Sequence, residues 1–146
     1  MRYRILFLML FAPLMASVLW AQADRLLGTY HVVHGKVESD VRITKQANGT
    51  YQCQVLWVSD QPGPDGKYGY DVKNPDPALR NVRLDRVVLM DGLVYKPELK
   101  VWGDARIYDP TSGKSYRVEL SFKDDKTLTV KGMWGPFSRK IYWEKK

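Results

Sequence analysis

The chain has 146 residues, 23 Lys and Arg against 16 Asp and Glu, a single Cys, and 45% hydrophobic residues. This length indicates one domain and permits a core that needs no disulfide framework, which a single Cys excludes in any case. The totals combine two unlike parts, because residues 1–23 are mostly apolar and carry only Arg2 and Arg4 as charges. Without these two arginines the formal charge falls by two, from +7 to +5.

Residues 1–23 have the three parts of a secretory signal peptide. Two arginines form the positive start, residues 5–20 form an apolar run, and Ala21-Gln22-Ala23 has the small-x-small pattern of a cleavage site. The run is shorter than the roughly 20 residues of a spanning helix, so we favour cleavage after Ala23 over an uncleaved anchor. We therefore expect an exported protein, periplasmic or secreted, with a single domain over 24–146 and no stable membrane insertion.

Composition and periodicity predict that residues 24–146 form strands. This part has 14 Val and 8 Tyr but only 3 Ala, and β-branched and aromatic residues suit a pleated sheet. Apolar residues alternate with polar ones, as in Tyr51, Cys53 and Val55, which places them on one face. The expected strands cover 28–34, 37–45, 50–58, 85–90, 93–101, 104–109, 114–122, 127–134 and 138–144.

Short turn sequences separate the strands, which favours antiparallel hairpins between neighbours. The turns expected are Asn48-Gly49, Asp91-Gly92, Ser112-Gly113 and 124–126. Successive hairpins make an all-β, up-and-down meander. Closing it into a β-barrel of about eight strands removes the exposed edges, while a two-sheet sandwich is the structural alternative.

One long loop, 60–84, breaks this rhythm with four Pro, three Gly and little alternation. Within it, Asp76 followed by Pro77 is typical of an N-cap and the first position of a short helical turn. A loop of this length in a compact domain is usually functional or disordered. Its apolar residues argue against simple disorder, so we expect it to cover one end of the barrel.

Several stretches of the chain resemble the bacterial domain-of-unknown-function family 2147, whose members are small exported proteins. The resemblance covers about 24–143 and is carried mainly by two runs, Asn-Pro-Asp-Pro-x-Leu-Arg at 74–80 and Ile-Tyr-Asp-Pro-x-x-Gly-Lys at 107–114. Further matching stretches are Asp24 to Tyr30, Cys53 to Trp57, Asp65-Gly66, Leu128 to Gly132, and Arg139 with Trp143.

This resemblance implies a lipocalin-like β-barrel, in agreement with the meander, and it implies no defined activity. Lipocalin-like proteins often begin with Gly-x-Trp and place a basic residue of the last strand over that ring. The resemblance therefore implies structural roles for Gly28, Tyr30 and Arg139, with Tyr in place of Trp.

Few residues suggest catalysis. Cys53 lies within an apolar strand face, which is typical of a buried packing thiol. His31 and His34 fall on opposite strand faces and have no partner at metal-ligand spacing. Carboxylates in the long loop suit turn and N-cap chemistry, so we expect no metal and no cofactor. An enzyme with a carboxylate site around Asp76 and Asp109 is the weakest of three hypotheses.

Scattered charges of both signs indicate a solvated exterior and no nucleic-acid partner. The aromatic residues are the remaining signal, since inward side chains of an eight-stranded barrel either fill it or line a pocket for one small ligand. The leading hypothesis is therefore a non-enzymatic protein that binds a small apolar or amphipathic ligand at the barrel mouth. The alternative is an envelope protein-protein interaction module with a packed barrel and an unknown partner. The residues assigned to ligand binding are Trp57, Trp102, Tyr108 and Trp143 as walls, with Asn74, Asp76, Arg80 and Asp109 as polar contacts.

Overall fold

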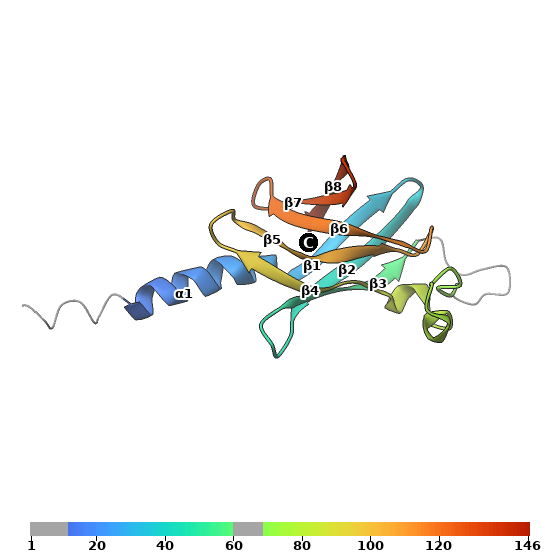
Figure 1. Ribbon diagram of the computed structural model, residues 1–146, viewed down its shortest axis with the longest axis horizontal. Coiled ribbons are helices and arrows are strands. Elements are labelled where there is room, and N and C mark those ends of the chain that lie inside the picture. The colour runs from blue at the N-terminus through green and yellow to red at the C-terminus, as the bar shows by residue number, and fades with distance from the viewer. Residues whose placement is uncertain (1–11, 60–68) are drawn as a thin grey trace, which may run out of the picture.

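The computed structural model describes residues 12–59 and 69–146. Arg2, Arg4 and the Asp65-Gly66 stretch therefore lie outside the described residues. Eight antiparallel strands form a closed barrel in which each pairs with the next and the last pairs back to the first (Figure 1). They are β1 (Gly28–His34), β2 (Val37–Lys45), β3 (Tyr51–Val58), β4 (Val88–Lys96), β5 (Val101–Asp109), β6 (Lys114–Phe122), β7 (Thr127–Trp134) and β8 (Phe137–Lys145).

The predicted meander is confirmed, and closure into a barrel excludes the sandwich. One predicted turn is wrong, because β4 continues through Asp91-Gly92 instead of reversing there. Gly92 has φ +73°, and β4 has one extra residue between its partners of Tyr51 and Cys53 on β3. A left-handed Gly produces such a β-bulge, so this Asp-Gly pair bends one strand. The chain reverses at residues 97–100 instead.

One end of the barrel, here called the closed end, is covered by the 3-10 helix η1 (Asp24–Leu26). Buried aromatic side chains of the barrel direct their polar atoms to this segment. Tyr30 donates to the Leu26 carbonyl at 2.8 Å, and Trp102 Nε1 donates to the Ala23 carbonyl at 3.1 Å. Tyr51 donates to Asp24 Oδ1 at 2.6 Å. The closed end is thus solidly packed, with each of these polar atoms partnered.

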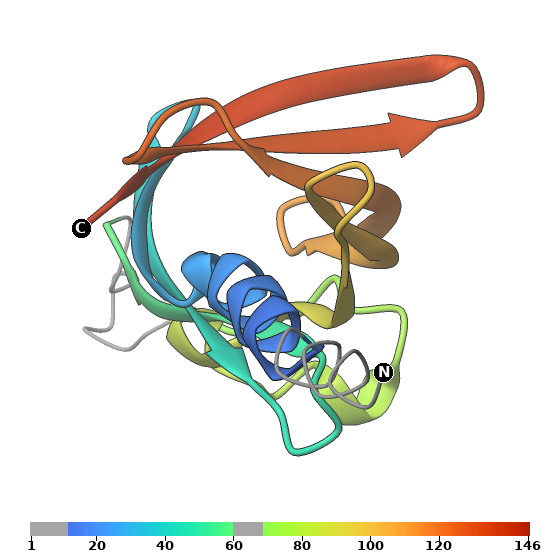
Figure 2. The same ribbon diagram turned by 90° about the vertical axis from the view of Figure 1, so that its left-hand side faces the viewer.

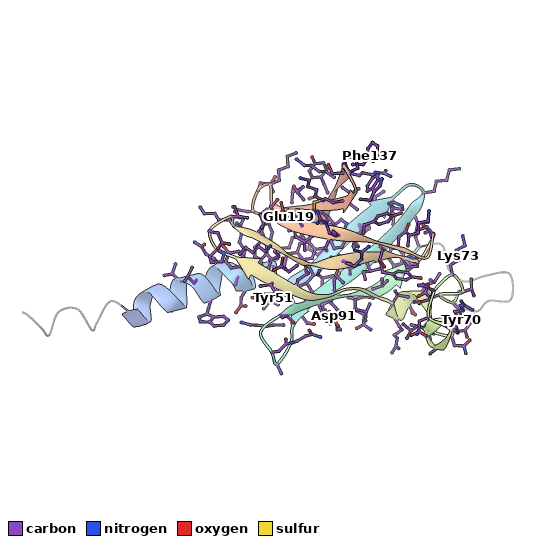
Figure 3. All side chains as sticks on the ribbon, in the orientation of Figure 1. Tyr51, Tyr70, Lys73, Asp91, Glu119 and Phe137 are labelled. Atoms are coloured by element: carbon purple, nitrogen blue, oxygen red, sulfur yellow. The ribbon has the colours of Figure 1, made fainter. Side chains whose placement is uncertain are left out.

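Helix α1 (Ala12–Ala23) leads into η1 and extends away from the closed end, which faces the viewer in Figure 2. None of the helices in the described part of the chain is long and apolar enough to cross a membrane. The opposite end of the barrel carries the long connection between β3 and β4, which includes η2 (Pro77–Leu79) and η3 (Leu84–Arg86). Figure 3 shows Tyr51 toward α1 and Tyr70 and Lys73 at the other extreme of the molecule.

The basic residue over the Tyr30 ring is Lys145, and not Arg139 as the resemblance implied. Lys145 Nζ lies 5.8 Å from the ring centroid and donates to the Arg25 carbonyl at 2.6 Å. Gly28 makes room for it, because a Cβ atom there would lie 3.1 Å from Lys145 Cε. Arg139 lies near the start of β8, so the length of the strand separates it from Tyr30.

Cys53 is fully buried, as predicted, and burial raises the pKa of its thiol, which keeps it protonated. The two histidines lie on opposite faces of β1. His31 faces outward, with Nδ1 2.9 Å from Asp40 Oδ1 of the neighbouring strand. His34 faces the barrel interior at its other end.

Candidate functional site

The end of the barrel opposite η1, here called the open end, holds a cavity of about 460 Å³. This volume falls in the range of small-molecule sites, which is roughly 300–1,000 Å³. Strand positions that face inward supply most of the wall, and the connection before β4 adds Leu84. The aliphatic lining residues are Val32, Val37, Val55, Val58, Leu84, Leu89, Ile107, Val130 and Ile141.

Side-chain size explains why this end is hollow. At the closed end the inward positions carry Tyr30, Tyr51 and Trp102. Further along the same strands, β1 and β3 place Val32 and Val55 inward, which have far less volume. Of the described residues in the β3–β4 connection, Leu84 alone lines this space, and a cavity remains between the valines.

Trp143 forms the floor of the cavity. Its side chain is 1% exposed, and its ring centroid lies 6.4 Å from that of Tyr30 at the closed end. It also lines the cavity. Its indole Nε1 is buried and has no hydrogen-bond partner within residues 12–59 and 69–146. Buried Trp N–H groups usually find a partner, so this donor is an unusual feature of the barrel core.

Polar side chains line the rim of the cavity, with His34, Asp109 and Arg139 carrying ionisable groups. Asp109 accepts hydrogen bonds from Thr111 N and Oγ1, at 2.9 and 2.6 Å, and from Ser112 Oγ at 2.9 Å. Burial opposes its charge, but these hydrogen bonds, aided by His34, outweigh burial and lower the pKa of Asp109. The rim therefore presents both a fixed anion, Asp109, and an exposed guanidinium, Arg139, while the wall below is largely apolar.

A buried carboxylate holds the long β3–β4 connection against β5 at the edge of the cavity. Asp71 accepts hydrogen bonds from Tyr108 Oη at 2.6 Å and from Asn74 Nδ2 at 2.8 Å. Burial and the hydrogen bond to Asp71 raise the pKa of Tyr108, which keeps its phenol protonated as a donor. Both oxygens of this buried carboxylate are thus used in fixing the structure.

The same connection also packs on the turn between β5 and β6. Lys73 Nζ donates to the Thr111 carbonyl at 2.8 Å. Gly113 has φ +72°, and a Cβ atom there would overlap the carbonyl oxygen of Lys73. The run at 107–114 therefore contacts the residues just before the run at 74–80, and the contacts of Asp71 and Lys73 explain Tyr108 and Gly113.

Asn74, Asp76 and Arg80 also serve the fold of this connection and do not line the cavity. Asp76 Oδ1 accepts from Ala78 N at 3.0 Å, which confirms the predicted N-cap of η2. Asp76 N in turn donates to Asn74 Oδ1 at 2.9 Å. Arg80 Nε donates to the Asn74 carbonyl at 2.8 Å. The hydrogen bonds of this motif are made within its own loop.

Of the eight residues assigned to ligand binding from the sequence, Tyr108, Asp109 and Trp143 line the cavity. Trp102 faces inward but lies at the closed end, where it reaches Ala23. Trp57 lies outside the cavity because of a β-bulge. Val41 pairs with Val55 and Asp40 with Trp57, so one extra residue, Leu56, reverses the alternation. Beyond it Val58 faces inward, and Trp57 is 43% exposed.

Several lining residues were not assigned from the sequence, although a signal for them was present. Period-two alternation continues through Val130, Gly132 and Trp134 on β7 and through Arg139, Ile141 and Trp143 on β8. It places these side chains inward. Alternation does not show which end of the barrel remains open. The sequence therefore could not show which of the inward residues line the cavity.

Comparison with known proteins agrees with this architecture. A family model described as "Uncharacterized protein conserved in bacteria (DUF2147)" matches residues 28–145. Among solved structures, the chain is similar to protein HP1028 from Helicobacter pylori, which is described as belonging to the lipocalin family. The two share 24% identity with a TM-score of 0.69, over 83% of this chain and 82% of that one, and this likeness concerns the fold alone. No curated protein matches. Because the family model spans all eight strands, the chain belongs to the DUF2147 family of bacterial proteins.

Proposed function

We propose that this protein is an exported binding protein that holds a small apolar or amphipathic ligand in the open-end cavity. The cavity itself carries this proposal, because its aliphatic wall, polar rim and volume of about 460 Å³ match the usual composition of a ligand site. The lipocalin-like fold adds support by analogy, since eight-stranded barrels of this type can hold one small ligand.

Binding is favoured over catalysis by the state of the carboxylates. Asp76 caps η2 and does not line the cavity, so it forms no pair with Asp109. A general acid needs a raised pKa, whereas the hydrogen bonds to Asp109 overcome burial and lower its pKa. The carboxylate enzyme considered from the sequence therefore gains no support from this geometry.

Export belongs to the same proposal and is supported by the three-part pattern of residues 1–23. Cleavage after Ala23 removes the carbonyl that accepts from Trp102 in the full chain. Mass spectrometry of protein recovered from the periplasm or medium should give a chain that begins at Asp24. A mature chain that begins at Met1 would contradict export by cleavage.

Ligand binding is tested by native mass spectrometry of protein purified from its own source. The expected result is an added mass of a small molecule, lost on denaturation. The recombinant chain should also bind the polarity-sensitive dye anilinonaphthalene sulfonate and release it when the extracted ligand is added. Absence of both the added mass and dye binding would contradict the proposal.

A second candidate function, a protein-protein interaction module, is favoured by one observation. Tyr70, Val72 and Leu79 are exposed apolar residues on the β3–β4 connection. This hypothesis included a barrel packed with side chains, and the cavity argues against that part. The cavity does not argue against a partner-binding surface on the loop. Pull-down from envelope extracts with all three residues changed to Ser should then lose a partner, and an unchanged set of partners would contradict it.

A further inference from the structure

The β7–β8 hairpin extends beyond the strands on either side of it, and Figure 2 shows it reaching away from the rest of the barrel. Pairing of β7 with β6 ends at Met133, and pairing of β8 with β1 ends at Glu144. β7 and β8 stay paired with each other as far as Trp134 and Phe137. The tip of the hairpin, residues 134–137, therefore has no neighbouring strand within the described part of the chain.

This tip exposes large aromatic side chains. Trp134 is 45% exposed and Phe137 is 63% exposed, and their ring centroids lie 6.3 Å apart. Tyr116 of β6 packs on Trp134, with 5.6 Å between the ring centroids. Figure 3 shows Phe137 at the outer edge of the molecule. Exposed apolar surface of this kind marks a contact with another molecule, because aromatic rings gain free energy when they leave water.

The outer face of β5 to β8 behind the tip is basic. Lys131 lies directly opposite Lys140, and Arg106 lies directly opposite Arg117. None of these four side chains forms an ion pair within the described part of the chain, although Glu119 on β6 lies opposite Lys131. Like charges directly opposite each other destabilise an antiparallel sheet, so this face favours an anionic partner that neutralises them.

The aromatic tip and the basic face are spaced as a membrane interface requires. Lys131 and Lys140 each lie three residues behind an aromatic residue of the tip, which is roughly 10 Å at about 3.4 Å per residue. No Asp or Glu occurs in 126–143. Aromatic rings favour the boundary between the acyl chains and the headgroups, while Lys and Arg favour the anionic phosphates beside it.

We infer that the β7–β8 hairpin docks reversibly, tip first, on an anionic lipid bilayer. The rings of Trp134 and Phe137 enter the interface, and the basic face contacts the lipid phosphates. The charges favour an anionic partner over a neutral one, and the aromatic tip favours a bilayer over a soluble polyanion. This inference goes beyond the proposed function and does not depend on a ligand in the cavity. Because Trp134 also lines the cavity, docking brings the open end to the lipid surface.

Vesicle sedimentation tests the inference on protein purified from its own source. The mass is measured first, so that every chain compared has the same N-terminus. The anionic vesicles contain phosphatidylglycerol and phosphatidylethanolamine, and the neutral ones contain phosphatidylcholine alone. The protein should bind the anionic vesicles more tightly, and added salt should weaken this binding by screening. Binding that is no tighter to anionic than to neutral vesicles would overturn the inference.

Matched variants assign the binding to the hairpin. Phe137→Ser should weaken binding to anionic vesicles about tenfold, because one aromatic ring no longer enters the interface. Leu99→Ser is its control, since Leu99 is 62% exposed in the turn at 97–100. Lys140→Gln should weaken binding about fivefold, the factor for about 1 kcal/mol per basic residue near an anionic surface. Lys100→Gln, in the same turn as Leu99, should leave it unchanged. A hairpin variant that binds as tightly as its control would overturn the inference.

Quenching by lipids with brominated acyl chains gives a second measurement, which reports position instead of affinity. In docked protein, Trp134→Phe should reduce the quenching of tryptophan fluorescence. Trp57→Phe should not, because Trp57 lies on β3, outside the hairpin. Equal quenching in the two variants would overturn tip-first docking. Binding to dextran sulfate in solution without binding to anionic vesicles would identify a soluble polyanion as the partner and overturn the bilayer.

Discussion

The two ends of the barrel are made from the same eight strands but fill their interiors differently. At the closed end, Tyr30, Tyr51 and Trp102 face inward, and residues 23–26 supply a hydrogen-bond acceptor for each of them. At the open end nine of the twenty lining residues are Val, Leu or Ile and four are aromatic, and a cavity of about 460 Å³ remains.

This difference shows what a buried aromatic residue with a polar atom requires. Buried Tyr and Trp side chains usually need a hydrogen-bond acceptor for their polar tips. Residues 23–26 supply such acceptors at the closed end. Trp143 lies between the two ends, with one side toward Tyr30 and the other toward the cavity, and its N–H has no acceptor in the described chain.

The largest effect is expected from truncating a tryptophan at the closed end. Trp102→Ala removes a buried ring and should lower the free energy of unfolding by about 3–5 kcal/mol. Trp134→Ala, at the open-end rim and 45% exposed, should cost less than about 1 kcal/mol. Urea unfolding followed by circular dichroism measures both. Equal losses would contradict the contrast between the ends.

Two glycines with similar backbone angles test the docking of the long connection. Gly113→Ala should cost about 2–4 kcal/mol, because it adds left-handed strain and overlaps the Lys73 carbonyl. Gly35 has φ +63°, but a Cβ atom there would meet open space. Gly35→Ala should therefore cost only the left-handed backbone strain, about 1–2 kcal/mol. Subtracting the loss in the free energy of unfolding for Gly35→Ala from the loss for Gly113→Ala gives the cost of the overlap with Lys73. No difference between them would contradict the packing of Lys73 on Gly113.

Enlarging two inward valines compares packed with open space directly. Val41 is completely buried and does not line the cavity, so Val41→Phe should destabilise the fold by about 1–3 kcal/mol. Val32 lines the cavity, and Val32→Phe should change stability by less than about 1 kcal/mol while abolishing dye binding. Denaturation and dye titration measure the two effects. Dye binding that persists in a folded Val32→Phe chain would contradict the assigned site.

The smallest effect concerns acid stability at the rim. Because the folded-state pKa of Asp109 lies below its ordinary value, its ionised form stabilises the fold above about pH 4, and this contribution disappears as pH falls through the folded pKa. Asp109→Asn should therefore be less stable than the unmodified chain at neutral pH, by less than about 1 kcal/mol after solvent screening. The gap should shrink toward about pH 3. A stability difference between the two chains that stays constant from neutral pH to about pH 3 would contradict the lowered pKa of Asp109.

Much of the fold could be predicted from local pattern. The alternation in 28–34, 37–45, 114–122 and 127–134 defines four strands to the residue, and Asp76 with Pro77 defines the start of η2. The failures occur at β-bulges. Gly92 has the backbone angle that a hairpin or a bulge can equally use, and only its cross-strand partners on β3 decide between them.

Part of the site could be predicted, and the rest could not. Tyr108, Asp109 and Trp143 follow from strand position and residue type, and all three line the cavity. Trp57 has the same parity as Val55 and should face inward, but the extra residue at Leu56 turns it outward. The long-loop motif around Asn74 was expected at the ligand, whereas its hydrogen bonds hold the loop together.

The sequence by itself determined the meander, the buried Cys53 and the alternation of inward and outward residues. These properties are local, because the pleat of a strand fixes which neighbours share a face. Tertiary structure alone decided which end is filled, which residues form the rim, and that Trp143 Nε1 finds no acceptor among residues 12–59 and 69–146. Those outcomes depend on the summed volume of side chains from eight strands and on the segment that crosses one end, and alternation along a strand encodes neither.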